Sequence, residues 1–345
     1  MRSIDECWRM VSDPNLAREV GLKVQMDELA LHTAFGDYDR VAALRTGSVV
    51  PRGVKLRVET LSPSEIFLRM CESLEFDVSE MSMGAHSYLC GAGESPFLGI
   101  PAFPSRAFRH AMVYANVEAR IDAPEDLNGK RIAIPEWGMT AVVWIVGILA
   151  DEHGLDIRSV DWVAERKSRV PIEVPDGMRM RLMGPGERLN DLLESGAVDA
   201  ALVHHVPDCF ESGSPRIERV FADFDAAERN YFHRTGLHPI MHCVVVRRDI
   251  HERHPWVARS MFDALCDARR LAMVRLRDTG AFSAMLPFLP AVVDETRELF
   301  GDDFWPYGLE SNRAVLEQFA EYAFQQGLTS RPLTIEELFP PNLLV

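Results

Sequence analysis

The chain has 345 residues, of which 47% are hydrophobic and 26% charged; this is the composition of a folded globular protein and excludes an intrinsically disordered one. Its formal net charge of −15 at pH 7 excludes binding to nucleic acid or to an anionic membrane by general electrostatic attraction. The N-terminus lacks the apolar core of a secretory signal, and the apolar residues 141–150 are too few to span a bilayer, so we expect a cytoplasmic protein.

Short apolar or alternating segments, typical of strands, alternate with helical segments at the spacing of parallel α/β units. Ser62 and Glu65 form a capping-box pattern around Pro63, which predicts the start of a helix. Predicted strands cover residues 29–35, 55–60, 76–81, 97–102, 131–135, 160–164, 178–183, 198–203 and 242–247. Predicted helices cover residues 38–45, 63–73, 84–90, 122–127, 141–153, 187–195 and 255–277, followed by an irregular helical tail to residue 345. Residues 165–177 are predicted to be an exposed loop.

This pattern predicts an α/β protein with two lobes. The first lobe is discontinuous and comprises residues 28–118 and 225–345, and the second comprises residues 119–224. Residues 1–27 are predicted to be an N-terminal extension. A cleft between two such lobes, with strand ends and helix N-termini facing it, suits a small anion.

Residues 103–110 read Phe-Pro-Ser-Arg-Ala-Phe-Arg-His and directly follow a predicted strand. The guanidinium groups of Arg106 and Arg109 are planar donors suited to carboxylates, and Phe103 can flank a flat ring. His110 can exchange a proton near neutral pH. The segment therefore suits the binding of an acid, although a solvated surface loop is the alternative that its composition leaves open.

Several separated motifs, in the same order along the chain, resemble the 4,5-dihydroxyphthalate decarboxylase family, from about Ala30 to the C-terminus. The motifs lie at residues 36–40, 76–82, 101–106, 109–110, 129–131, 135–136, 231–236, 239–242 and 303–308.

The resemblance implies a two-lobed fold like that of type 2 periplasmic binding proteins. It also implies non-oxidative decarboxylation of a hydroxylated aromatic dicarboxylate, 4,5-dihydroxyphthalate, to protocatechuate. Two alternatives stay open at this point. One is a non-catalytic solute-binding protein for an aromatic or other organic acid, and the other is an enzyme that acts on a different hydroxyaromatic acid.

Such a reaction needs a cationic clamp for the carboxylate that stays and a general acid aimed at the ring carbon. We expect Arg106, Arg109 and Arg234 to form the clamp, although each is of a type more often found in surface ion pairs. His110 and His242 are the candidate proton donors, and a structural hydrogen-bonding role is the alternative for each.

Two acidic residues directly follow or end predicted strands, where they would face the cleft. Glu80 and Glu136 are expected to accept a phenol proton or to orient a histidine, unless they only cap helices. Thr140 and Ser82 are expected to hold a carboxylate at helix starts. Tyr231, within one of the family-like motifs, is a further candidate for substrate binding.

We expect no cofactor, because protonation of a ring carbon needs no metal in principle; a divalent ion chelating two phenolic oxygens is the alternative. His238 and His242 have ligand-like spacing, but Pro239 breaks the helix that would align them. The expected partner is a small aromatic acid, not nucleic acid or membrane, and a homo-oligomer is left open. His204 and His205 are not included among the catalytic candidates.

Overall fold

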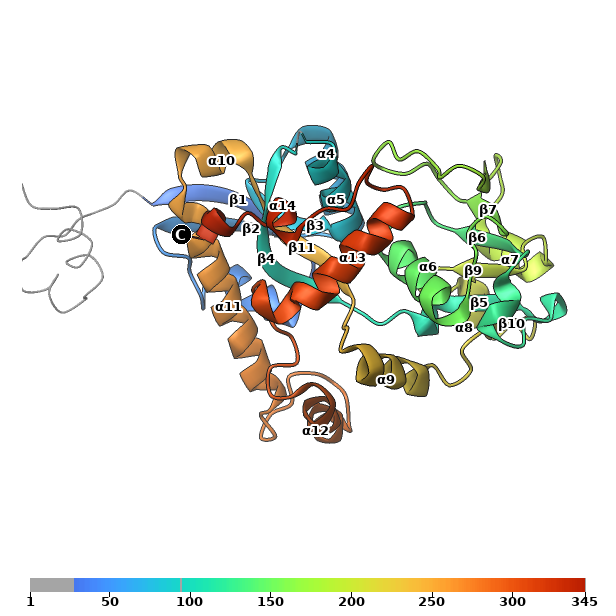
Figure 1. Cartoon of the computed structure of the whole chain (residues 1–345). Coiled ribbons are helices and arrows are strands. Elements are labelled where there is room, and N and C mark those ends of the chain that lie inside the picture. Colours follow the sequence, from blue (N-terminus) through green and yellow to red (C-terminus); the bar gives the residue numbers. More distant parts are fainter. Residues whose placement is uncertain (1–27, 94, 345) are drawn as a thin grey trace, which may run out of the picture.

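In the computed structural model, which describes residues 28–93 and 95–344, the chain forms two lobes, each built on a β-sheet (Figure 1). The predicted extension over residues 1–27 lies outside the described residues. Within the described residues the first sheet has the strand order β2-β1-β3-β11-β4 and the second has the order β10-β5-β9-β6-β7-β8. The strands are β1 (Leu29–Phe35), β2 (Val54–Thr60), β3 (Val78–Ser82), β4 (Phe97–Arg106), β5 (Val113–Asn116), β6 (Arg131–Ile134), β7 (Asp161–Ala164), β8 (Arg179–Leu182), β9 (Ala200–Leu202), β10 (Ile217–Arg219) and β11 (Ile240–Arg247).

Helices pack on both sheets and between them. They are α3 (Asp39–Arg45), α4 (Pro63–Ser73), α5 (Met83–Gly91), α6 (Thr140–His153), α7 (Leu189–Ser195), α8 (Asp208–Glu211), α9 (Phe224–Thr235), α10 (Arg248–Arg253), α11 (Trp256–Leu276), α12 (Leu289–Phe300), α13 (Arg313–Gln325) and α14 (Ile335–Leu338). Short 3₁₀ turns lie at η1 (His110–Met112), η2 (Val117–Ala119), η3 (Pro124–Leu127), η4 (Glu310–Asn312) and η5 (Pro341–Leu344). None of the helices in the described part of the chain is both long and apolar enough to cross a membrane. The predicted two-lobed α/β architecture is confirmed.

The first sheet brings several strand ends to one edge. Strand β1 runs parallel to β2 and β3, whereas β11 runs antiparallel to both β3 and β4. The carboxyl ends of β1, β3 and β4 and the beginning of β11 therefore lie at the same edge of the sheet.

The second sheet has an equivalent edge. Strand β6 is parallel to β7 and β9, and β5 is antiparallel to β9. The carboxyl ends of β9, β6 and β7 and the beginning of β5 therefore meet. In open α/β sheets ligands bind outside the carboxyl ends of the strands, so both edges are places to look for a site.

Helix α6 joins the two lobes. All its residues from Thr140 to Leu149 are buried, because one side packs in the core of the first lobe and the other in the core of the second. A helix that is apolar all round is stable only when it is covered on every side. Its Gly147 has no room for a side chain, since a Cβ there would lie 2.3 Å from the ring of Tyr322 on α13. Helices α6 and α13 thus cross closely between the lobes (Figure 1).

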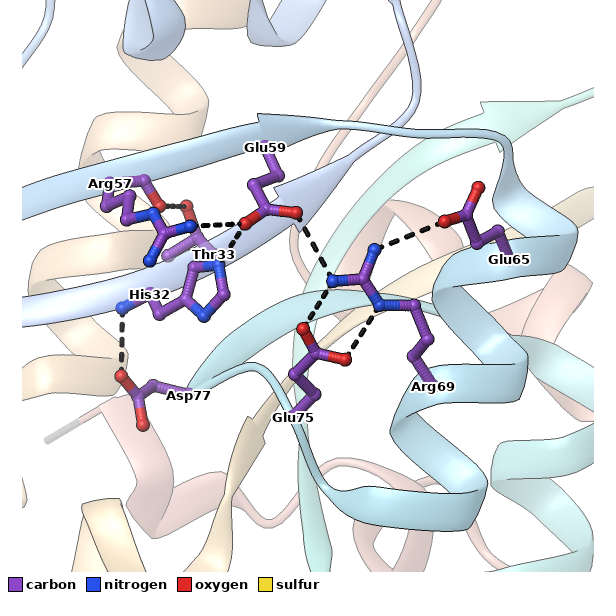
Figure 2. A network of polar contacts seen from close by, with 8 residues as sticks. All are labelled: His32, Thr33, Arg57, Glu59, Glu65, Arg69, Glu75 and Asp77. Atoms are coloured by element: carbon purple, nitrogen blue, oxygen red, sulfur yellow. Dashed lines mark hydrogen bonds and ion pairs between the residues drawn. The ribbon is translucent and has the colours of Figure 1, made fainter.

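A network of charged side chains fastens α4 to the outer strands of the first sheet (Figure 2). The guanidinium group of Arg69 on α4 contacts the carboxylates of Glu59, Glu65 and Glu75. Glu59 also accepts a hydrogen bond from His32 Nε2 at 2.7 Å, and this bond lowers the pKa of the Glu59 carboxyl. Helix α4 begins as predicted, with the Ser62 hydroxyl accepting from a backbone N–H in the first turn. The network holds in place a helix whose opposite face reaches the candidate site.

Three segments differ from the sequence-based expectations. The strand predicted over residues 97–102 continues to Arg106. Its pairing with β11 shifts in register around Pro104, which has no N–H to donate to a neighbouring strand. Strand β5 was not predicted, and although it lies within residues 28–118 it pairs with the second sheet. Residues 224–235, for which no helix or strand was predicted, form α9. The Asp223 side chain caps its N-terminus, and Gly236 is its C-cap residue.

Candidate active site

At the edge of the first sheet a buried carboxylate faces a histidine. Glu80 on β3 is fully buried; its Oε1 accepts the backbone N–H of Gly36 at 3.0 Å. The other oxygen, Oε2, lies 3.6 Å from Nδ1 of His242 on β11. That Nδ1 is buried, so the 16% of the His242 side chain that is exposed belongs to other parts of the ring. One nitrogen of the imidazole thus faces a buried carboxylate within ion-pair distance, without a hydrogen bond, while another part of the side chain reaches the surface.

Two aromatic rings border this pair. Phe67 on α4 meets the His242 ring edge-on, with ring centroids 4.8 Å apart. Tyr38, just after β1, lies near Glu80; burial and then the charge of Glu80 raise the pKa of its phenol, so it stays protonated at neutral pH. The guanidinium group of Arg40 lies over the Tyr38 ring, 4.4 Å from the ring centroid. The Glu80–His242 pair is therefore bordered by the aromatic side chains of Phe67 and Tyr38.

The two lobes touch where α5 and α6 begin. The hydroxyls of Ser82 and Thr140 are hydrogen-bonded at 2.8 Å, and Thr140 Oγ1 also accepts the N–H of Gly84 at 2.9 Å. A Cβ on Gly84 would lie 2.4 Å from the carbonyl oxygen of Gly138. The structure therefore brings together Ser82 and Thr140, whose hydroxyls join the two lobes; that they hold a substrate carboxylate stays a prediction.

The edge of the second sheet carries charged and imidazole side chains. Glu136 follows β6 by two residues, His204 follows β9 by two, and Arg166 follows β7 by two. Arg166 Nε donates to Glu136 Oε2 at 2.8 Å, and Arg169 Nε lies 3.9 Å from Oε1 of the same carboxylate. Glu136 is thus engaged with two arginines rather than capping a helix.

Arg109 lies at the same edge, just before β5, and is only partly exposed. Its Nε donates to the sulfur of Met241 at 3.2 Å and its Nη1 to the carbonyl of His204 at 3.5 Å. Arg109 forms no ion pair with a carboxylate of the described residues, and burial lowers its pKa to about 10, opposed by the charge of Glu228. A largely buried cation without a carboxylate partner is unusual and suits a site that receives an anion.

His204 lies among these arginines. Burial lowers its pKa to about 3, assisted by the charges of His205, Arg109, Arg166 and Arg169. It is therefore neutral at neutral pH. Sequence reasoning did not include His204, Arg166 or Arg169. A signal was present, since the basic run 166–169 directly follows a strand in an otherwise acidic chain.

We call these residues the junction site. They are Glu80, Ser82 and His242 from the first lobe and Arg109, Glu136, Thr140, Arg166, Arg169 and His204 from the second.

Arg106 and Phe103, which were expected to bind substrate, have other contacts. Arg106 donates to the carbonyls of His238 at 3.1 Å and Pro306 at 2.8 Å, and to the side chain of Asn312. These bonds fasten the C-terminal segment to β4. The Phe103 ring is fully buried in the first lobe's core.

His110, Tyr231 and Arg234 lie around α9. The His110 ring is buried against the rings of Phe221 and Tyr231. Burial raises the pKa of Tyr231. Arg234 is 56% exposed and is paired with Glu152 at 2.6 Å. The structure does not bring these three side chains into contact with the Glu80–His242 pair.

The lowered pKa values of three buried histidines predict that the stability of the protein depends on pH. Burial lowers the pKa of His110 to about 4, and those of His204 and His238 to about 3, from an ordinary value of 6.5. Between the ordinary and the lowered pKa values the unfolded chain binds more protons than the folded protein does. The free energy of unfolding therefore falls as the pH drops from about 6.5 towards 4. We expect His110→Gln to flatten this dependence by up to about 1.4 kcal/mol per pH unit, measured by urea unfolding at about pH 7.5 and about pH 5. The same substitution at the exposed His233 serves as the control; an equal change in both variants would contradict the assignment.

No group of three or more His, Cys, Asp or Glu side chains within residues 28–93 and 95–344 is arranged to hold a metal ion.

A search against protein-family models gave no match. Among curated proteins, the chain is 35% identical over 325 residues to 4,5-dihydroxyphthalate decarboxylase of Comamonas testosteroni, covering 92% of this chain and 98% of that protein. It is 33% identical over 223 residues to 4,5-dihydroxyphthalate decarboxylase of Pseudomonas putida, covering 63% and 85%.

The solved structures that resemble this one share its fold at low sequence identity. The periplasmic aliphatic sulphonate binding protein SsuA from Escherichia coli aligns with a TM-score of 0.53 and 13% identity, covering 90% of this chain and 91% of that one. A mutant of DSZB in complex with biphenyl-2-sulfinic acid aligns with a TM-score of 0.51 and 16% identity, covering 92% and 98%. These likenesses establish the two-lobed fold of periplasmic binding proteins.

Proposed function

Since the chain belongs to the 4,5-dihydroxyphthalate decarboxylase family, and is on that ground a carboxy-lyase, we propose that it converts 4,5-dihydroxyphthalate to protocatechuate and CO2. The observation that carries this proposal is the 35% identity to one such decarboxylase along 98% of that protein's length.

The chemistry sets the roles that residues must fill. A proton is added to a ring carbon that bears a carboxylate, the bond to that carboxylate breaks, and its electron pair returns to the ring as CO2 leaves. A hydroxyl para to this carbon donates electrons while the ring is not aromatic. The site must therefore supply a proton at one carbon and hold the other carboxylate still.

His242 is the proton donor in this proposal, and Glu80 positions it. Support comes from the 3.6 Å approach of Glu80 Oε2 to His242 Nδ1, which places a carboxylate within ion-pair distance of one nitrogen of the ring. The other sequence candidate, His110, is less suited, since its pKa of about 4 leaves it uncharged near neutral pH.

Arg109 binds the carboxylate that stays on the ring. Of the three arginines expected to form the clamp, Arg106 and Arg234 already have partners within the protein. Arg109 has only a sulfur and a long contact to a carbonyl, which a substrate carboxylate would replace with stronger, charge-assisted hydrogen bonds.

The test is CO2 release from a panel of hydroxyphthalates and hydroxybenzoates. We expect release from 4,5-dihydroxyphthalate, formation of protocatechuate, and, in deuterium oxide, one deuterium at the ring carbon that lost its carboxylate. Prolonged chelation before the assay is expected to leave the rate unchanged, because the proposed steps use no metal. Tight binding of one acid without any CO2 release would instead indicate a solute-binding protein.

A further inference from the structure

We propose that Arg166 and Arg169 complete the anchor for the retained carboxylate and thereby select dicarboxylates. The inference rests on the proposed function. A diacid can place one carboxylate on the anchor and present the other to His242. An acid with a single carboxylate would be held by the group that must leave, with its reactive carbon turned away from the proton donor.

The first observation is the position of three arginines. Arg166 and Arg169 both approach the carboxylate of Glu136, and Arg109 Nη1 donates to the carbonyl of His204. Because His204, Glu136 and Arg166 follow the neighbouring strands β9, β6 and β7, these cations lie close together in a protein whose net charge is −15. Arg166 lies 2.8 Å from Glu136 and 3.8 Å from Glu165, and Arg169 lies 3.9 Å from Glu136. With Arg109, which has no carboxylate partner among the described residues, the three arginines outnumber these two carboxylates.

The next observation is a cavity in the second lobe. A cavity of about 480 Å³ opens beside Arg166 and Arg169 and is lined by Trp137, Ala164, residues 166–172, Val174 and residues 180–182. Its walls combine basic side chains with apolar ones, which is the lining that a flat aromatic acid needs. The 165–177 loop, expected to be merely exposed, thus forms one wall of a site.

Direct contacts connect the second sheet to the proton donor. Arg109 Nε donates to the sulfur of Met241, which precedes His242 in β11. Ser82, which lies opposite His242 in the first sheet, is hydrogen-bonded to Thr140 at the start of α6. The arginine anchor and the imidazole therefore border the same junction between the lobes.

In the protein without substrate, Glu136 keeps Arg166 and Arg169 in place. A bound carboxylate would take over part of their hydrogen bonding, and guanidinium groups suit this because they can donate two parallel bonds to one carboxylate. Because the anchored carboxylate is present in substrate, transition state and product alike, losing an arginine should weaken binding more than it slows the chemical step.

The experiment uses Arg169→Gln in the full chain. We expect KM for 4,5-dihydroxyphthalate to rise about 10- to 100-fold while kcat changes by less than about threefold. By calorimetry, 3,4-dihydroxybenzoate, which keeps one carboxylate, should bind more weakly by a similar factor, whereas catechol, which has none, should bind as it does to the unmodified protein.

Arg179→Gln is the matched control. Arg179 lies on β8 outside the lining of the cavity, and its side chain is more than half exposed and paired with Asp161, so its loss should leave both KM and the binding of 3,4-dihydroxybenzoate within about twofold. Arg166→Gln alone would leave Glu136 buried without its 2.8 Å partner, so Arg166 is tested in the pair Glu136→Gln with Arg166→Gln, which leaves the net charge of the site unchanged.

The outcomes separate the two proposals. If the unmodified protein releases CO2 but KM and ligand binding are unchanged in Arg169→Gln, the anchor is wrong and the proposed function stands. If no CO2 is released but 3,4-dihydroxybenzoate binding falls in Arg169→Gln, the anchor stands and the proposed function fails. Absence of both turnover and binding in the unmodified protein would overturn both.

Discussion

His242→Gln is expected to lower kcat for 4,5-dihydroxyphthalate about 100- to 10,000-fold, the usual contribution of a positioned general acid. Glutamine keeps a polar group of similar size opposite Glu80 Oε2 but cannot deliver a proton to a ring carbon. KM should change little, because the carboxylate anchor lies in the other lobe. The rate of CO2 release under saturating substrate measures the effect.

The matched control for this variant is His110→Gln. His110 is buried between Phe221 and Tyr231, away from Glu80, so its substitution should change kcat by less than about threefold. Thermal unfolding of both variants shows whether a loss of activity results from a less stable protein. If His110→Gln lost the activity and His242→Gln kept it, the two sequence candidates would exchange roles.

Arg109→Met is expected to lower kcat/KM about 100- to 1,000-fold, which corresponds to losing one or two hydrogen bonds to a charged group. The same change should leave the free energy of unfolding equal or higher, because it removes a largely buried charge that has no carboxylate partner among the described residues. Loss of activity together with unchanged or greater stability is the signature of a functional group. Calorimetry with 3,4-dihydroxybenzoate and thermal unfolding measure the two parts.

Arg234→Gln provides the comparison for Arg109. Arg234 is 56% exposed and forms a surface ion pair with Glu152, so we expect kcat/KM and stability to change little. A large loss of stability in Arg109→Met, with unchanged affinity for 3,4-dihydroxybenzoate, would indicate that Arg109 stabilises the folded protein and does not bind the substrate.

Local patterns predicted the architecture well. The Ser62-Pro63 start of α4, the run of strands up to β4 and the apolar α6 are all present in the structure. Each depends on periodicity, capping or a glycine stop, which neighbouring residues determine. Strand β5 was missed, although β6, β7 and β8 are equally short and were predicted.

Strand ends also predicted part of the junction site. Glu80, Ser82, Glu136 and Thr140 were selected because residues at the carboxyl ends of parallel strands and the first turns of helices face the same side. Sequence alone could not show that Glu80 meets His242, since these residues belong to strands that become neighbours only in the folded sheet.

The sequence by itself determined the two α/β lobes, the family resemblance and a short list of arginines and histidines. Only the tertiary structure decided which arginine lacks strong hydrogen-bond acceptors. Arg106 donates to Asn312, 206 residues away, and Arg234 to Glu152, 82 residues away, so neither pairing can be recognised from neighbouring residues. Whether a guanidinium group is satisfied depends on what the fold places within a few ångströms of it, and among the described residues Arg109 has only a sulfur and a long contact to a carbonyl.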